Sequence, residues 1–152
     1  MTDHAASVFA DPLQAFVRDA RVRMALVLET SGKVLAQHGF TRSLDVMSAC
    51  SLVSAIHASA SELGKLLEGE PFGPLHHGGT ERQVFLAPFR CGGRTVLLLA
   101  VFDASSSLGI VRLFWSEFAR LVADAPRSPM TEQASEFERE LQHNLAVLFG
   151  RA

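Results

Sequence analysis

The segment from Arg94 to Trp115, RTVLLLAVFDASSSLGIVRLFW, constrains the fold more than any other part of the chain. Its apolar run, Val96 to Phe102, shows no alternation of polar and apolar residues. This is typical of a central strand covered on both faces, or of one covered by a helix on one side and a partner on the other. The run stops at Asp103. Asp103 and Ser105–Ser107 all carry side-chain oxygens that can accept hydrogen bonds from the free N–H groups of a helix start. We therefore predict a central strand followed by a helix that packs back along the sheet. Nothing in this segment is chemically reactive, which favours a packed interaction module over a catalyst.

The rest of the chain predicts a mixed fold of strands and helices. Gly32 supplies the positive φ that a tight hairpin turn needs, and Asp11-Pro12 is a helix-start signal because proline is tolerated at the first helical position. The weak, glycine-bounded segment Gly73–Gly79 has the length of a short edge strand. In chain order we predict a helix from Asp11 to about Ala20, strands over Met24–Glu29 and Val34–His38, a helix over Arg42–Leu67, strands over Gly73–Gly79, Val84–Phe89 and Arg94–Phe102, and a helix from about Ser107 to Ala123.

The long predicted helix has an unusual middle. Ten of the fourteen residues in Ser48–Ser61 are Ala, Ser or Cys, so another backbone can approach this helix closely. An apolar stripe also runs along the helix at helical spacing and consists of Leu52, Ile56, Leu63 and Leu67. Two interpretations of the small-residue face stay open. It packs on the sheet of its own domain, or it docks another helix or a partner protein.

The segment DAPRSP, Asp124 to Pro129, breaks the helical pattern with two prolines and is interpreted as a linker. The predicted organisation is a flexible N-terminus (1–10), one domain (11–124), a linker (125–131) and a C-terminal amphipathic helix (132–152). The apolar side of that last helix consists of Phe137, Leu141, Leu145, Leu148 and Phe149. Because the linker gives this helix reach, we favour docking on a partner over packing on its own sheet.

Composition excludes several classes of function. The net charge is −2 and no stripe of Lys and Arg occurs, which argues against sequence-independent binding of nucleic acid. The first residues lack the pattern of a signal peptide, and no apolar run approaches the roughly 20 residues of a membrane span. Cys50 and Cys91 are far apart in sequence, which favours reduced thiols and a cytoplasmic protein. A hydrophobic content of 48% is high for a small domain and favours an apolar surface covered by a partner.

Motifs for catalysis or cofactor binding are absent from the sequence. Ser31-Gly32-Lys33 is not a phosphate-binding P-loop, because Val34 follows the lysine and no glycine precedes at the required spacing. His76 and His77 would point to opposite faces of a strand, which argues against a metal site. Cys50 and His57 share a helix face, but no third group orients them as a catalytic pair. We therefore expect no catalytic residue, no metal and no cofactor.

Three features together resemble the Roadblock/LC7 family, and within it the bacterial MglB group. These are Ala25–Glu29 with Ser31-Gly32, the small-residue helix, and above all Val101–Asp103 followed by the SLGIVRL block Ser107–Leu113. The resemblance covers about Asp11 to Asp124. It implies an α+β fold of the longin-like type, with a five-stranded antiparallel sheet and helices on its faces. It also implies a homodimer joined through the predicted strand Gly73–Gly79 and the long helix.

The resemblance implies a regulator rather than an enzyme. The chain would bind a Ras-like, MglA-like small GTPase and stimulate its GTP hydrolysis without an arginine finger, by favouring the hydrolysis-competent state of the switch regions. The process would be cell polarity or gliding motility. The positions carried over to the GTPase contact are Ala55, Ala58, Ser59, Glu62 and Arg112, and the C-terminal docking helix would use Leu145, Leu148 and Phe149.

Two other functions are weighed against this one. The chain could be a scaffold that joins proteins of a polarity or signalling complex, other Roadblock proteins among them, without any effect on hydrolysis. An enzyme with a ligand pocket near His57 or His76 is disfavoured. The sequence leaves open the identity of the GTPase, the choice of dimer or tetramer, and the stoichiometry with the GTPase.

Overall fold

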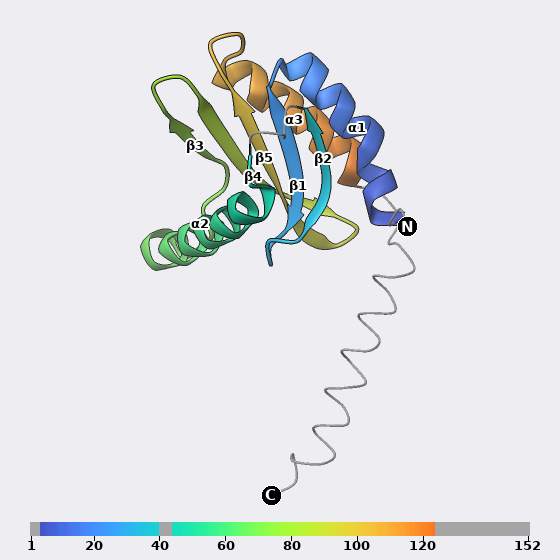
Figure 1. Ribbon diagram of the computed structural model, residues 1–152. Helices are drawn as coiled ribbons and strands as arrows, with labels where there is room; N and C mark the ends of the chain where they lie inside the picture. Colours follow the sequence, from blue (N-terminus) through green and yellow to red (C-terminus); the bar gives the residue numbers. More distant parts are fainter. Residues whose placement is uncertain (1–3, 40–43, 124–152) are drawn as a thin grey trace, which may run out of the picture.

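The computed structural model describes residues 4–39 and 44–123, which form one antiparallel sheet with helices on both faces (Figure 1). The helices are α1 His4–Ala20, α2 Val46–Glu68 and α3 Leu108–Ala123. The strands are β1 Met24–Glu29, β2 Val34–Gly39, β3 Leu75–Gly78, β4 Gln83–Cys91 and β5 Arg94–Phe102, arranged in the order β2-β1-β5-β4-β3. The predicted fold class and the predicted order of elements are confirmed.

β5 is the central strand of the sheet. It pairs antiparallel with β1 on one side and with β4 on the other. The residues from Val96 to Ala100 are all buried, and successive side chains enter two different hydrophobic clusters on opposite faces of the sheet. The prediction of a central strand covered on both faces is therefore confirmed.

The turn after β5 is closed by the polar side chains that the sequence singled out. The Asp103 Oδ1 atom accepts hydrogen bonds from the N–H and the hydroxyl of Ser105, and its Oδ2 atom lies 2.8 Å from Arg23 Nε. The Ser107 Oγ atom accepts from the N–H of Ile110 at 3.3 Å and so caps α3. Asp103 thus shapes the turn, whereas Ser107 is the residue that caps the helix.

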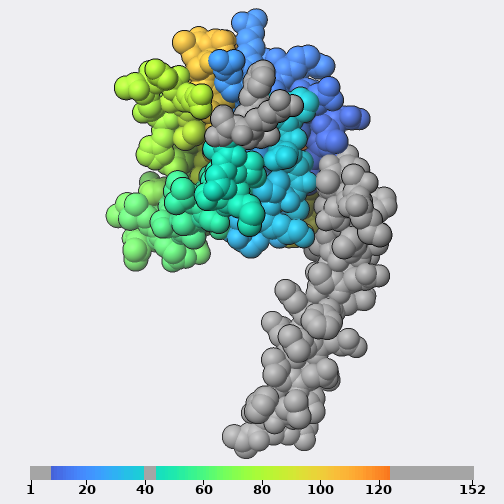
Figure 2. All heavy atoms as spheres, viewed as in Figure 1, coloured from blue at the N-terminus to red at the C-terminus, as the bar shows by residue number. Residues whose placement is uncertain are grey.

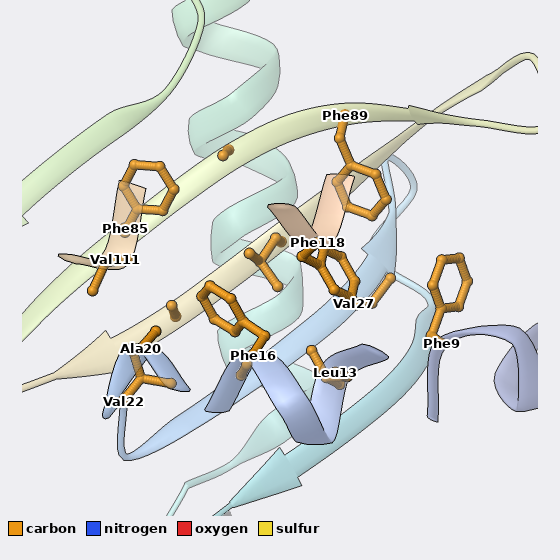
Figure 3. Close-up of a cluster of buried hydrophobic side chains, with 14 of the residues drawn as sticks. Phe9, Leu13, Phe16, Ala20, Val22, Val27, Phe85, Phe89, Val111 and Phe118 are labelled. Atoms are coloured by element: carbon orange, nitrogen blue, oxygen red, sulfur yellow. The ribbon is translucent and has the colours of Figure 1, made fainter. Parts of the chain in front are cut away.

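α1 and α3 cover one face of the sheet around an aromatic cluster (Figure 3). Phe118 of α3 lies between Phe16 of α1 and Phe89 of β4, with ring centroids 6.0 and 5.4 Å away. The edge-to-face arrangement of Phe89 and Phe118 is one that aromatic pairs prefer. Trp115 of α3 is half-buried and packs edge-on against Phe85, with ring centroids 5.7 Å apart.

α1 begins earlier than the sequence predicted. The helix starts at His4, so Pro12 lies inside it rather than at its first position, and the expected loose segment does not extend over residues 4–10. Proline removes one backbone hydrogen bond from a helix interior. Phe9 precedes Pro12 in the helix, is only 3% exposed and packs edge-on against Phe89. The first part of α1 therefore belongs to the core of the domain.

α2 lies on the other face of the sheet (Figure 1). It begins at Val46 rather than at Arg42, because Asp45 takes the N-cap position and its carboxylate accepts from the N–H of Ser48 at 3.2 Å. Gly69 ends the helix in the left-handed conformation, with φ of 81°. Arg42, the linker 125–131 and the C-terminal helix 132–152 lie outside the described residues.

Candidate functional site

The face of α2 that meets the sheet is built from small side chains. Cys50, Val53 and Gly64 are its fully buried residues. A Cβ atom on Gly64 would lie 2.5 Å from the backbone nitrogen of Phe72 and 2.6 Å from the carbonyl oxygen of Glu70. The segment after the helix therefore folds back against it at a distance that only glycine allows. This close contact holds the C-terminal half of α2 in place.

The hairpin between β1 and β2 holds the middle of the same helix. The Ser54 hydroxyl donates a hydrogen bond to the carbonyl oxygen of Thr30 in the hairpin turn. A Cβ atom on Gly32, whose φ is +97°, would lie 3.4 Å from the carbonyl oxygen of Cys50. The hairpin thus approaches α2 closely, and the helix presents one fixed face to the outside.

The outward face of α2 is strongly apolar. The apolar stripe of Leu52, Ile56, Leu63 and Leu67 is 64, 41, 50 and 68% exposed, respectively. Met47 and Leu66 of the same helix are exposed as well. Contiguous exposed apolar patches of this kind mark interaction sites.

Part of the small-residue face packs on the domain's own sheet, as one of the two interpretations predicts, because Cys50 is buried there. Ala55, Ala58 and Ser59 of the same stretch are exposed, so docking of another helix or a partner protein on them stays a prediction.

An apolar groove continues this surface toward the edge of the sheet. Figure 2 shows the green atoms of α2 and the yellow-green atoms of β3 on the same side of the molecule. Its volume is about 240 Å³, and it lies between Leu52 and Ile56 of α2 and Leu75 and His77 of β3. Strands β1, β4 and β5 are not exposed edges, whereas β3 is a terminal strand of the described sheet. The apolar stripe, the groove and the open edge of β3 therefore form one continuous surface.

The predicted GTPase-contact residues of α2 lie on the flank beside the apolar stripe. Ala55, Ala58, Ser59 and Glu62 are all exposed, and their spacing places them on one side of the helix. Ala58 and Glu62 line an open cavity of about 560 Å³ between α2, the hairpin turn and the segment Pro71–Gly73. The structure therefore brings these four residues together.

The polar groups on this flank are few and weakly held. Glu62 Oε1 lies 3.2 Å from Lys65 Nζ, and both side chains are mostly exposed, so this ion pair contributes little to stability. Burial lowers the pKa of His57, which lines the same cavity, because desolvation disfavours its charged form. The imidazole is therefore expected to be neutral at pH 7.

Arg112 does not join the α2 residues. It is exposed on α3, which packs on the opposite face of the sheet. Within residues 4–39 and 44–123, its guanidinium group has no ion-pair or hydrogen-bond partner. Leu145, Leu148 and Phe149, the predicted docking residues of the C-terminal helix, lie outside the described part of the chain.

Within residues 4–39 and 44–123, no three His, Cys, Asp or Glu side chains gather in a way that could hold a metal ion. Burial raises the pKa of the Cys50 thiol and so favours its unreactive protonated form. None of the helices within the described ranges is long and apolar enough to cross a membrane. What the site offers is an apolar and small-residue surface suited to binding.

Comparison with known proteins identifies the fold. Neither a protein-family model nor a curated protein sequence matches the chain. MglB of Myxococcus xanthus superposes with a TM-score of 0.72 and 24% sequence identity, covering 81% of this chain and 90% of that one. The gliding protein MglB of Thermus thermophilus gives a TM-score of 0.69 and 25% identity, covering 81% and 91%.

Two further structures are similar. An MglB described as having a tetrameric arrangement gives a TM-score of 0.71 and 25% identity over 81% of this chain and 90% of that chain. A Roadblock/LC7 domain from Streptomyces avermitilis gives a TM-score of 0.59 and 13% identity over 76% and 91%. The five-stranded sheet with its three helices is thus the Roadblock/LC7 fold.

Proposed function

We propose, on the premise that this chain is an MglB-like protein with the Roadblock/LC7 fold, that it is a homodimeric regulator of a bacterial Ras-like small GTPase. In this proposal it binds the GTPase and stimulates GTP hydrolysis while contributing no catalytic residue. The observation that carries the proposal is the outward face of α2, where an apolar stripe and a row of small residues lie side by side on one helix. Its setting would be the cytoplasm, in cell polarity or gliding motility.

The homodimer is supported by the surface that joins α2 to β3. A second copy that paired with the open edge of β3 would satisfy its free N–H and C=O groups. The same copy would cover the apolar stripe, which runs beside that edge. Of the surfaces on the described domain, this one combines free backbone groups with exposed large apolar side chains, as the interface of a stable dimer does.

The GTPase contact is assigned to the flank of α2 that a second copy would leave open. Ala55, Ala58 and Ser59 have short side chains, so a partner backbone can come close there. Glu62 can meet a cation of the GTPase. Such a surface acts by binding the hydrolysis-competent switch conformation more tightly than the others, which raises its population. Arg112, on the far layer, would make a separate contact.

The experiment measures phosphate release from the GTP-loaded MglA-like GTPase of the same organism, with and without this protein. Ala58→Arg should abolish both binding and acceleration, because the long charged side chain fills the surface that the GTPase must approach. Ala10→Arg, on the exposed side of α1, is the matched control and should leave both unchanged. Binding by Ala58→Arg as tight as that of the original chain would refute the assigned surface.

The same experiment distinguishes the scaffold function. Binding of the GTPase without any change in phosphate release would mean that the chain joins proteins, other Roadblock proteins among them, and does not regulate hydrolysis. If the chain neither binds the GTPase nor accelerates its hydrolysis, it has the Roadblock/LC7 fold but not this partner.

A further inference from the structure

The open edge strand β3 carries two adjacent exposed histidines, His76 and His77. The strand contains only the four residues Leu75–Gly78, all of them paired with β4 on its inner side. A second copy that extends the sheet must therefore pair with these same four residues. Such an interface brings imidazoles of the two copies together whenever His76 or His77 lies opposite its counterpart.

The apolar stripe of α2 determines the orientation of the second copy. Leu75 and His77 line the groove beside that stripe, on the α2 face of the sheet. His76 lies on the α3 face, where its ring stacks on Phe102 with centroids 6.0 Å apart. To bury both stripes in one interface, both α2 helices must lie on the same face of the joined sheet. The two-fold axis then runs perpendicular to the sheet.

This symmetry restricts the register of the two β3 strands. Residues directly opposite each other in an antiparallel pair point to the same face, and a perpendicular two-fold axis preserves the faces. One residue must therefore lie on the axis, opposite itself. If His76 lies on the axis, residues 75–77 of β3 in one copy pair with the same residues in the other copy. If His77 lies on the axis, residues 76–78 of the two copies pair in this way. If Leu75 or Gly78 lies on the axis, only that one residue of β3 pairs with its counterpart, so these two registers are disfavoured.

We propose that a pair of identical histidines on the dimer axis makes assembly of this protein depend on pH, an inference that rests on the homodimer proposed above. In either favoured register, two imidazoles face each other with Cβ atoms about 4.5–5.5 Å apart. Histidine gains its charge between about pH 8 and pH 5, so acidification places two like charges opposite each other. The dimer is then stable when the imidazoles are neutral and weakens as they are protonated.

Within residues 4–39 and 44–123, neither imidazole forms an ion pair with a carboxylate. The groove around His77 is otherwise lined by apolar side chains from α2, β3, β4, β5 and the residue Leu44. His76 Nε2 lies 2.7 Å from the amide oxygen Oε1 of Gln83, and its ring packs on Phe102. A carboxylate beside either ring would have favoured the protonated pair, whereas the neighbours of His77 are apolar and the amide of Gln83 is neutral.

The test measures the dimer Kd of the full chain by sedimentation at about pH 8 and about pH 5.5, with EDTA present to exclude bridging metal ions. The dimer Kd should rise by up to about fivefold at the lower pH, as expected for like charges directly opposite each other on neighbouring strands. The double variant His76→Asn/His77→Asn should dimerise with the same Kd at both values. His38→Asn, on the other edge strand β2, is the matched control and should keep the pH dependence. The two single variants identify the residue on the axis.

Two results would overturn the inference while leaving the dimer intact. One is a dimer whose Kd is the same at both pH values, and the other is equal weakening of the original chain and the double variant. A chain that stays monomeric at every pH and concentration would instead refute the proposed homodimer, and the pH dependence with it. Thermal melting of each variant at both pH values checks that the domain itself stays folded.

Discussion

The substitution Leu52→Ala tests whether the apolar stripe of α2 joins two copies of this protein. Leu52 is 64% exposed in the single chain, so most of its side chain makes no contact within the domain. Removal of its branched end should therefore destabilise the folded domain by less than about 1 kcal/mol. In the proposed dimer the same atoms are buried in both copies, and the substitution acts twice.

The size of the effect follows from the exposed area. A buried CH₂ group contributes about 0.8 kcal/mol, and leucine exceeds alanine by three carbons, so burial of the exposed 64% is worth roughly 1.5 kcal/mol per copy. The dimer should lose roughly 3 kcal/mol, which raises its Kd about 100-fold. Sedimentation over a dilution series measures this change, and thermal melting of the monomer checks the fold.

Leu113 provides a matched control for this measurement. It is 65% exposed, on α3 and thus on the opposite layer of the sheet. Leu113→Ala removes the same atoms from an equally exposed position and should leave the Kd unchanged. The reasoning fails if Leu52→Ala dimerises as tightly as the original chain, or if Leu113→Ala weakens the dimer to the same degree.

Three further predictions concern the helix, its cap and the tail. Gly64→Ala should destabilise the domain by about 1–3 kcal/mol in urea unfolding, because the new Cβ collides with the backbone of Phe72, although alanine is otherwise the better helix former. A gain in stability would contradict the close contact. Hydrogen bonds from the Ser48 hydroxyl and N–H lower the pKa of Asp45 from its ordinary value of 3.8. The cap therefore stabilises the fold above that value and is lost as the pH falls through the lowered pKa. Asp45→Ala should accordingly lower Tm at neutral pH, and the difference in Tm should shrink in strong acid; a difference independent of pH would argue against the cap. Deletion of residues 130–152 should weaken GTPase binding in a pull-down without a change in Tm, whereas a lower Tm would assign that helix to the core.

Local patterns were enough to predict the order of the elements. The unbroken run Val96–Phe102 predicts a strand buried on both faces because neither side has room for a polar residue. Gly32 predicts a hairpin turn because such a turn needs a positive φ, and its φ is positive in the structure. The predicted start of α1 was wrong because this end of the helix packs through Phe9 on Phe89. The two residues are 80 positions apart in sequence, so no local pattern contains their contact.

For the candidate site, the sequence determined which residue types lie on α2 and at what helical spacing. It could not determine which side of the helix faces the sheet, because both the small residues and the apolar stripe are plausible inner faces. Only the tertiary structure decided this. The hairpin turn and the segment after α2 approach so closely that small residues such as Gly64 must face inward, and the leucines are left exposed. The layers of the fold also placed Arg112 on the opposite face from Ala58, a separation that depends on how the helices pack and that no spacing along the chain encodes.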